Sequence, residues 1–317
     1  MKLASVLTPL SDENLTLAAQ TGVEQVVVRY PGPNLALLDE VQTRIESFGM
    51  RIGVVEGDLP IENIKLGRDD GTEMEQMKAL VRHLGASDIP LICYNFMAGT
   101  DWIRTTVDAP ERGGAKVTGF DLNHLDSARI PGREPFRTTL EPGAKGDQLW
   151  TNLEAFLTEI LPVAEDAGVV LAMHPDDPPL PSLLGNERVM HCVDGFVRLV
   201  NLVPSSSNAI AFCQGTFSEM GIDIPSAIRQ LGGHIAYVHF RDVNGTAECF
   251  TETWQDTGQT DMVEAMRAYR DIGFDGPIRP DHVPQLVGED DGEPGYTMLG
   301  RLFAYGYIRG LMDATEA

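Results

Sequence analysis

Short apolar runs alternate with longer amphipathic segments along nearly the whole chain. The apolar runs have the length of strands, and they predict strands at residues 2–6, 25–29, 51–55, 89–93, 169–173, 209–212, 235–238 and 277–280. Apolar residues at helical spacing predict helices near residues 34–48, 74–84, 149–167, 193–202, 224–231, 262–272 and 298–312. Repeated strand–helix alternation is typical of α/β folds with a parallel sheet. We therefore predict one (β/α)8 TIM-barrel domain over residues 1–317, which the last helix closes.

The alternation is interrupted by a long segment after the fourth predicted strand. Residues 99–147 contain many glycines and prolines, scattered charges and little strand or helix period. A loop of this length inside a compact domain is usually either functional or disordered. Because it leaves the carboxyl end of a strand, we interpret it as an insertion that forms a lid over the barrel mouth. A partly disordered insertion is the alternative.

Composition limits the classes of function. The formal net charge of −23 argues against nucleic acid and anionic membrane surfaces as partners, since both select basic patches. The apolar runs are far shorter than the roughly 20 residues that cross a bilayer, and the N-terminus lacks the apolar core of a secretory signal. The four cysteines form no CxxC pair or dense framework. We expect a cytoplasmic protein that acts on small molecules.

Four consecutive predicted strands in the second half of the chain each end at a potential metal ligand. These ligands are His174, Cys213, His239 and Asp281. A single His or Cys after a strand is more often structural, but a TIM barrel brings all its strand ends to one active-site face. The mixture of soft and hard donors favours Mn²⁺, Fe²⁺, Co²⁺ or Zn²⁺ over Mg²⁺ or Ca²⁺. Four protein ligands would close a tetrahedral zinc site, so we expect Mn²⁺ or Fe²⁺ before Co²⁺ or Zn²⁺.

Residues beside these ligands suggest supporting roles. Asp176 and Asp177 are placed to orient the imidazole of His174. Arg241 lies two residues after His239 and therefore on the same side of an extended chain, where a guanidinium can grip a substrate carboxylate. A surface pair between Arg241 and Asp242 is the structural alternative.

The residues that follow the eighth predicted strand suggest acid–base chemistry. Adjacent residues at a strand end cannot both point inward in the same manner, so Asp281 is assigned to the metal and His282 to proton transfer. Tyr296, in the last loop, can supply a phenol. We also expect Asn95 and Arg279 to bind the substrate, together with Arg241.

Several of these motifs, in order along the chain, resemble those of the mannonate dehydratase family, whose members have a xylose-isomerase-like barrel. The matching segments are residues 55–67, 92–97, 101–105, 161–164, 174–179, 212–215, 238–241 and, as the most specific, 273–282. The resemblance extends from about residue 50 to residue 312. Departures occur at residues 184–189, at Val283 in place of a glycine, and at residues 254–256, where a histidine is missing. They affect loops at the barrel mouth and leave the four predicted ligands in place.

The resemblance implies a metal-dependent hydro-lyase of hexuronate (glucuronate) catabolism. Its reaction would convert D-mannonate, or a related aldonic acid, into 2-keto-3-deoxy-D-gluconate and water. The four ligand positions carry over as metal ligands, and His282 and Tyr296 carry over as the acid–base pair. His282 is then the base at C2, and Tyr296 or a water on the metal is the acid at C3, although the two roles can be exchanged. Relatives of this kind also lead us to expect a homo-oligomer.

Two other functions remain as alternatives. The first is a sugar isomerase or epimerase on the same barrel, which the cysteine ligand and the scarcity of glutamates at strand ends disfavour. The second is a non-catalytic protein that binds sugar acids, which the presence of His282 and Tyr296 disfavours.

Overall fold

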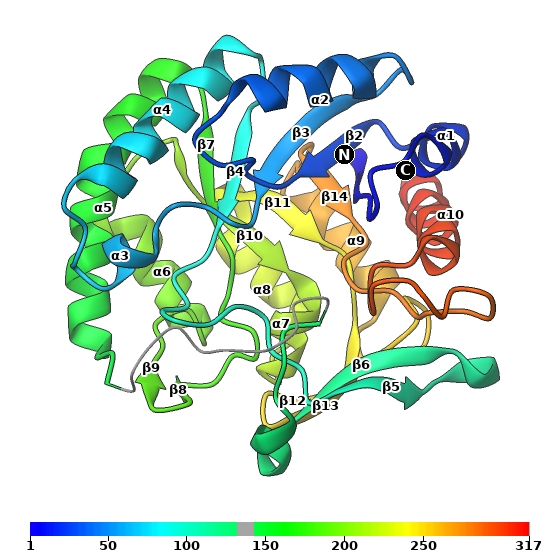
Figure 1. Cartoon of the computed structure of the whole chain (residues 1–317). Coiled ribbons are helices and arrows are strands. Elements are labelled where there is room, and N and C mark those ends of the chain that lie inside the picture. The colour runs from blue at the N-terminus through cyan, green and yellow to red at the C-terminus, as the bar shows by residue number, and fades with distance from the viewer. Residues whose placement is uncertain (132–142, 317) are drawn as a thin grey trace.

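A closed barrel of parallel strands forms the centre of the computed structural model, which describes residues 1–131 and 143–316 (Figure 1). Around the barrel the strands follow the order β1 (Lys2–Val6), β14 (Pro277–Arg279), β11 (Ile235–His239), β10 (Asn208–Cys213), β7 (Val170–Met173), β4 (Leu91–Tyr94), β3 (Arg51–Glu56) and β2 (Gln25–Val28). Strand β1 pairs with both β2 and β14, which closes the ring. The predicted (β/α)8 barrel is therefore confirmed.

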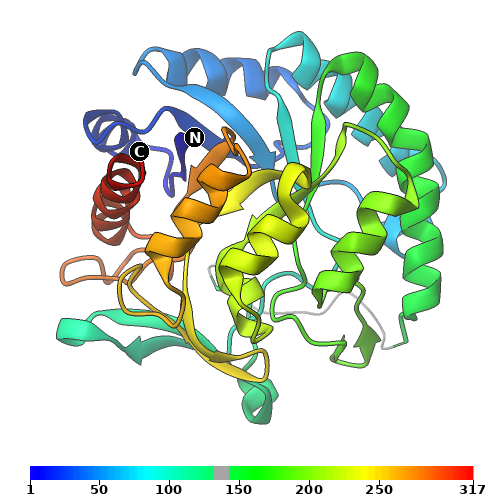
Figure 2. The same ribbon diagram turned by 180° about the vertical axis from the view of Figure 1, so that it is seen from behind.

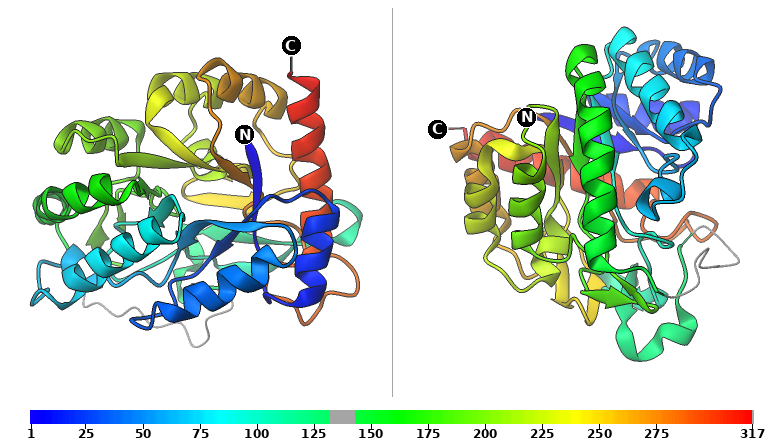
Figure 3. Two further views of the ribbon diagram at one scale, coloured as in Figure 1. Left: turned by 90° about the horizontal axis from the view of Figure 1, so that it is seen from above. Right: turned by 90° about the vertical axis from the view of Figure 1, so that its left-hand side faces the viewer.

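Helices cover the outside of the barrel, as the view from behind also shows (Figure 2). They are α1 (Asp12–Gln20), α2 (Ala36–Glu46), α3 (Glu62–Lys65), α4 (Thr72–Ala86), α5 (Gly146–Ala167), α6 (Val193–Leu202), α7 (Gln214–Glu219), α8 (Ile224–Leu231), α9 (Met262–Asp271) and α10 (Met298–Ala314). Helix α10 lies beside α1, so the two ends of the chain meet (Figure 1; Figure 3). This contact agrees with the prediction that the last helix closes the barrel.

Local sequence explains where the longest helix ends and which face it buries. Leu153, Phe156, Leu157 and Ile160 of α5 repeat at helical spacing, and each is at most 1% exposed. The helix ends at Gly168, whose φ of 67° is the left-handed conformation that glycine adopts without strain. The apolar face of α5 thereby packs against α4 and β7.

Small and medium-sized side chains make up most of the inner cluster of the barrel, which also holds Leu91, Tyr237 and Tyr296. The inner cluster includes Ala4, Val27, Val54, Ala172 and Ala211, which are all buried. Small residues leave the larger polar side chains at the strand ends room to turn inward. None of the helices in the described residues has the length and hydrophobicity needed to span a membrane.

A second, antiparallel sheet accounts for part of the long segment after β4. Strands β5 (Thr106–Pro110) and β6 (Lys116–Asp121) form a hairpin, and β6 pairs with β13 (Cys249–Glu252), which pairs with β12 (Val243–Thr246) (Figure 1). The expectation of little strand structure in residues 99–147 was therefore wrong for this hairpin. Its partner β13 lies far away in the sequence, so no local period reveals the pairing. Residues 132–142 of the predicted lid lie outside the described residues.

Candidate active site at the carboxyl ends of the strands

A cavity opens at the carboxyl ends of the barrel strands. Its polar lining comes from Arg29, Glu56, Asn95, Asp101, Trp102, His174, Asp177, His239, Arg279, Asp281, His282 and Tyr296. Arg29 follows β2, Glu56 ends β3, His174 follows β7 and His239 ends β11. The barrel thus brings side chains from widely separated parts of the chain to one face, as this fold requires.

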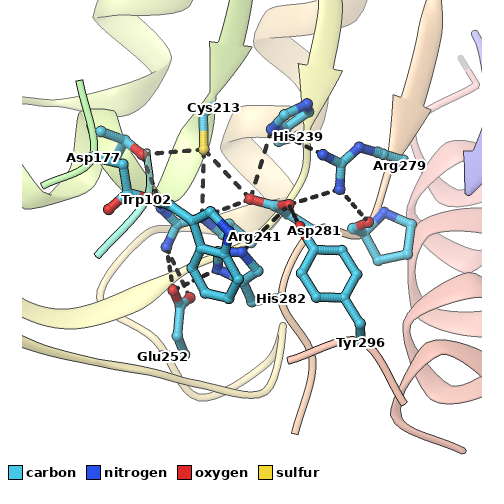
Figure 4. A network of polar contacts seen from close by, with 12 residues as sticks. Trp102, Asp177, Cys213, His239, Arg241, Glu252, Arg279, Asp281, His282 and Tyr296 are labelled. Atoms are coloured by element: carbon cyan, nitrogen blue, oxygen red, sulfur yellow. Dashed lines mark hydrogen bonds and ion pairs between the residues drawn. The ribbon is translucent and has the colours of Figure 1, made fainter. Parts of the chain in front are cut away.

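Three of the four predicted metal ligands form a compact cluster at this cavity, which His174 and His239 line, while Cys213 is fully buried. Each of His174, Cys213 and His239 offers a ligand atom, and these atoms lie within 4.8 Å of one another. The fourth, Asp281, has its Oδ2 atom 3.7 Å from the Sγ atom of Cys213 and 3.6 Å from Nδ1 of His239 (Figure 4). The structure therefore brings all four side chains together. Their role as metal ligands remains a prediction.

The chemical states of these groups suit a divalent metal ion. Nδ1 of His174 lies 2.7 Å from the carbonyl oxygen of Pro175, which can only accept, so the lone pair of Nε2 is left for a ligand. Nε2 of His239 is buried without a hydrogen-bond partner; it lies 3.3 Å from Glu56 Oε2 but in poor hydrogen-bond geometry. Burial alone would raise the pKa of the Cys213 thiol, but the charge of Arg241, together with the neighbouring imidazoles, holds that pKa well below its usual range. A thiolate is the form of cysteine that binds metals.

The expected orientation of His174 by carboxylates was wrong. Asp176 Oδ2 accepts a hydrogen bond of 2.7 Å from the backbone N–H of Met190, and Asp177 pairs with two arginines. The stiff turn after β7 places the carbonyl of Pro175 next to the imidazole in their place.

A second cluster of possible ligands shares His239 with the first. Glu56, Cys93 and His239 also offer ligand atoms within 4.8 Å of one another. However, Arg279 already donates to Glu56 Oε1 at 2.6 Å, and burial raises the pKa of Cys93 to about 12. A neutral thiol is a poor ligand, whereas the pKa of Cys213 is lowered, so the first cluster is the better site. Glu56 was not predicted, although it ends β3, where the rule applied to the other strands would have found it.

A buried glutamate fixes the imidazole of His282. Nδ1 of His282 lies 2.8 Å from Oε1 of Glu252, and the imidazole stacks on Trp102 with ring centroids 4.2 Å apart (Figure 4). Burial would raise the pKa of Glu252, but Arg241, His282 and Arg104 together lower it to about 2. Because an ionised carboxylate only accepts, Nδ1 must carry a proton, and Nε2 of the neutral ring is free to accept one. Neither Glu252 nor Trp102 was predicted.

Tyr296 lies beside His282, and the role of the two as an acid–base pair remains a prediction. The two rings meet edge to face with centroids 5.3 Å apart, and the hydroxyl group donates to Asp281 Oδ1 at 3.4 Å. Burial raises the pKa of Tyr296, and the charge of Asp281 raises it further. The phenol therefore stays protonated at neutral pH, which suits a proton donor.

Arg241 lies beneath the cavity and is not part of its wall. The side chain is 0% exposed, and its guanidinium reaches Asp281 at 3.1 Å, Glu252 at 2.8 Å and Asp177 at 3.0 Å (Figure 4). The prediction that Arg241 grips the substrate does not fit this geometry, since carboxylates of the protein itself occupy its donors. The alternative of a surface pair with Asp242 was also wrong. The strand period correctly placed Arg241 on the same side of the chain as His239, but carboxylates of the protein already pair with its guanidinium group.

Arg104 ties the segment after β4 to the same group of charges. Its guanidinium is fully buried and donates to Asp177 at 2.6 and 3.1 Å and to Glu252 at 2.6 Å. This anchor lies two residues from Trp102 and thus holds the indole against His282. The part of the predicted lid that the structure describes therefore contributes to the cavity wall.

The other two predicted substrate ligands line the cavity. Asn95 Oδ1 accepts from Lys65 Nζ at 3.0 Å and from the backbone N–H of Met97 at 3.1 Å, which orients the amide so that Nδ2 remains a donor. Arg279 donates to Asp281 and to Glu56, in each case at 2.6 Å. Its main contacts are thus with the protein, while its role in substrate binding stays a prediction.

Comparison with known proteins identifies relatives over most of the chain. Residues 11–317 match the family model described as D-mannonate dehydratase (UxuA), so the match begins earlier than the expected residue 50. Mannonate dehydratase of Oceanobacillus iheyensis is 34% identical over 300 residues, which are 88% of this chain and 85% of that protein. The enzyme of Endomicrobium trichonymphae is 32% identical over 310 residues, with 88% and 84% covered.

Solved structures agree with these relatives. The crystal structure of mannonate dehydratase from Streptococcus suis serotype 2 superposes with a TM-score of 0.89 and 29% identity, and covers 99% of this chain and 95% of that one. An L-ribulose 3-epimerase superposes with a TM-score of 0.65 at 14% identity, over 99% of this chain and 96% of that one. At that identity the epimerase shows only a shared barrel fold.

Proposed function

Because the chain belongs to the D-mannonate dehydratase (UxuA) family, we propose that it is a metal-dependent enzyme that converts D-mannonate into 2-keto-3-deoxy-D-gluconate and water. One observation carries the proposal. The cluster of His174, Cys213, His239 and Asp281 borders the cavity that also holds a protonated phenol and an imidazole oriented by a carboxylate. An elimination next to a carboxylate needs these three functions together.

The first chemical step is loss of the proton at C2. Nε2 of His282 takes this proton, because Nδ1 is held by Glu252. The imidazole becomes an imidazolium, and the buried Glu252 carboxylate stabilises its charge. A positioned base of this kind contributes about 10²- to 10⁴-fold to the rate.

The second step is loss of the hydroxyl group at C3. The phenol of Tyr296 donates a proton to this group, which leaves as water while the electron pair from the broken C2–H bond forms the C2–C3 double bond. The resulting enol tautomerises to the 2-keto acid, and one water is released for each substrate consumed. Return of the proton from His282 to Tyr296 restores both residues.

The four clustered side chains would hold the metal ion, with Mn²⁺ or Fe²⁺ expected before Co²⁺ or Zn²⁺. When bound, the ion supplies Lewis acidity that stabilises the negative charge developing on the substrate oxygens. Burial of the cluster excludes bulk water and strengthens this electrostatic stabilisation.

A product assay with metal-depleted and metal-loaded protein tests the proposal. We expect 2-keto-3-deoxy product from D-mannonate with Mn²⁺, and loss of most turnover after chelation. A panel of other aldonic acids, aldoses and ketoses should react more slowly. Interconversion of an aldose and a ketose without product from any aldonic acid would contradict the proposal and favour an isomerase. We further expect the reaction to serve hexuronate catabolism in the cytoplasm and the protein to form a homo-oligomer.

A further inference from the structure

A sugar acid that enters this cavity meets a wall rich in negative charge. Glu56, Asp101, Asp177 and Asp281 all line it, and the protein has a net charge of −23. An anionic substrate therefore needs a positive group with hydrogen-bond donors to spare.

The two arginines in the cavity wall differ in how fully the protein occupies them. Arg279 is 1% exposed and donates to carboxylates at 2.6 Å. The side chain of Arg29 is 44% exposed, and its nearest carboxylate oxygens, on Asp58 and Glu293, each lie 3.8 Å away. These distances are ion-pair distances beyond the range of a hydrogen bond. Within the described part of the chain, Arg29 is thus the cavity arginine with donors available.

The position of Arg29 in the barrel also suits a substrate contact. It directly follows β2, which lies opposite β10 in the ring of strands, and it lines the same cavity as His174 and His239. Arg29 interacts electrostatically with Tyr296 and Glu56, both of which line the cavity. A molecule held between the predicted metal site and Arg29 would lie beside His282 and Tyr296.

We infer that Arg29 binds the carboxylate of the substrate and takes the role that the sequence had assigned to Arg241. The inference rests on the proposed function, because it requires the substrate to be a sugar acid. A guanidinium can meet both carboxylate oxygens at once, whereas a lysine offers only a point charge. Arg29 would thereby help the cavity to select acids over neutral sugars.

Binding of a matched pair of ligands to Mn²⁺-loaded protein tests this inference. D-mannonate and D-mannitol have the same carbon chain, but only the first carries a carboxylate. Calorimetry should show that Arg29→Gln weakens the binding of D-mannonate about 10- to 100-fold, as expected for loss of charge-assisted hydrogen bonds. The affinity for D-mannitol should stay unchanged. Arg29→Lys should recover part of the loss. The control Arg44→Gln removes the same charge from an exposed arginine that pairs with Asp12 on the outer surface, and should bind both ligands normally.

The outcomes separate the two proposals. Equal weakening of D-mannonate and D-mannitol would overturn the carboxylate contact and place Arg29 against the polyol chain. Unchanged binding of both ligands would overturn any contact. A wild-type protein that does not bind D-mannonate at all would contradict the proposed function together with this inference.

Discussion

Replacement of Glu252 by glutamine should separate the orientation of the base from the binding of the metal. Glu252 is 1% exposed, and its Oε1 atom lies 2.8 Å from Nδ1 of His282, 2.6 Å from Arg104 and 2.8 Å from Arg241. Glutamine keeps the size of the side chain but removes its charge. It also places an NH2 group, which cannot accept a hydrogen bond, close to the N–H donors of Arg104 and Arg241.

Two costs follow from this change. Removal of one partner from a buried ion pair typically costs about 3–5 kcal/mol of stability, so the unfolding temperature should fall clearly. An amide can donate to Nδ1 of His282, which would move the ring proton to Nε2 and block the base. Loss of an orienting carboxylate beside a catalytic histidine lowers kcat about 10⁴-fold in serine proteases, so we expect a loss of about 10²- to 10⁴-fold here.

The assay combines steady-state kinetics on D-mannonate with metal analysis and thermal unfolding. Metal content should stay at the wild-type level, because Glu252 is not among the predicted ligands. The control Glu264→Gln removes an exposed carboxylate that pairs with Arg267 on α9, and it should change stability by at most about 1 kcal/mol and leave kcat unchanged. A kcat within about threefold of the wild type, with Glu252→Gln folded and metal-loaded, would refute the role of Glu252 and of the base it orients.

Three further predictions test other parts of the account. Tyr296→Phe should lower kcat about 10²- to 10⁴-fold with little change in KM for D-mannonate, and an unchanged kcat would exclude the phenol as the acid. Cys213→Ala should lose most of its bound metal when measured by elemental analysis after dialysis, and full retention would remove the thiolate from the ligand set. Burial opposes ionisation of Glu252 and Asp177, but their arginine partners lower the pKa of both, that of Glu252 to about 2 from an ordinary value of 4.5. The unfolded chain therefore binds more protons in acid, so the stability that these carboxylates provide should be complete above about pH 5 and decline as the pH falls toward 2. Thermal unfolding temperatures that stay constant from pH 6 to pH 3 would contradict this cluster of charges.

Local sequence patterns were sufficient to predict the barrel and to place its four candidate ligands. His174, Cys213, His239 and Asp281 each end or follow a strand, and the closed ring then brings strand ends together whatever the loops do. The same rule also points to Glu56, which ends β3 and lines the cavity but was not among the predicted residues. Helix α1 was not predicted either, although Ser11, which caps it by accepting from Asn14 N, and Asp12 form a typical helix start.

The polar network beneath the cavity could not be predicted in the same way. Arg104 reaches Glu252 where the β5–β6 hairpin pairs with β13, and this pairing joins segments that are distant in the sequence. Glu252 meets Arg241 across the shorter β12–β13 hairpin. The strand period predicts the side of the chain on which Arg241 lies. It cannot predict that Oδ2 of Asp177 lies 3.0 Å from the Arg241 guanidinium group. Long-range packing of this kind decides which charged groups pair with each other inside the protein. It also decides which of them remain available to bind a substrate.

The location of the metal ion is the most direct test of the account. Diffraction data collected near the manganese absorption edge from crystals grown with Mn²⁺ would show it as an anomalous peak. We predict one strong peak among His174, Cys213, His239 and Asp281. A peak among Glu56, Cys93 and His239, or no peak in crystals of active enzyme, would contradict it.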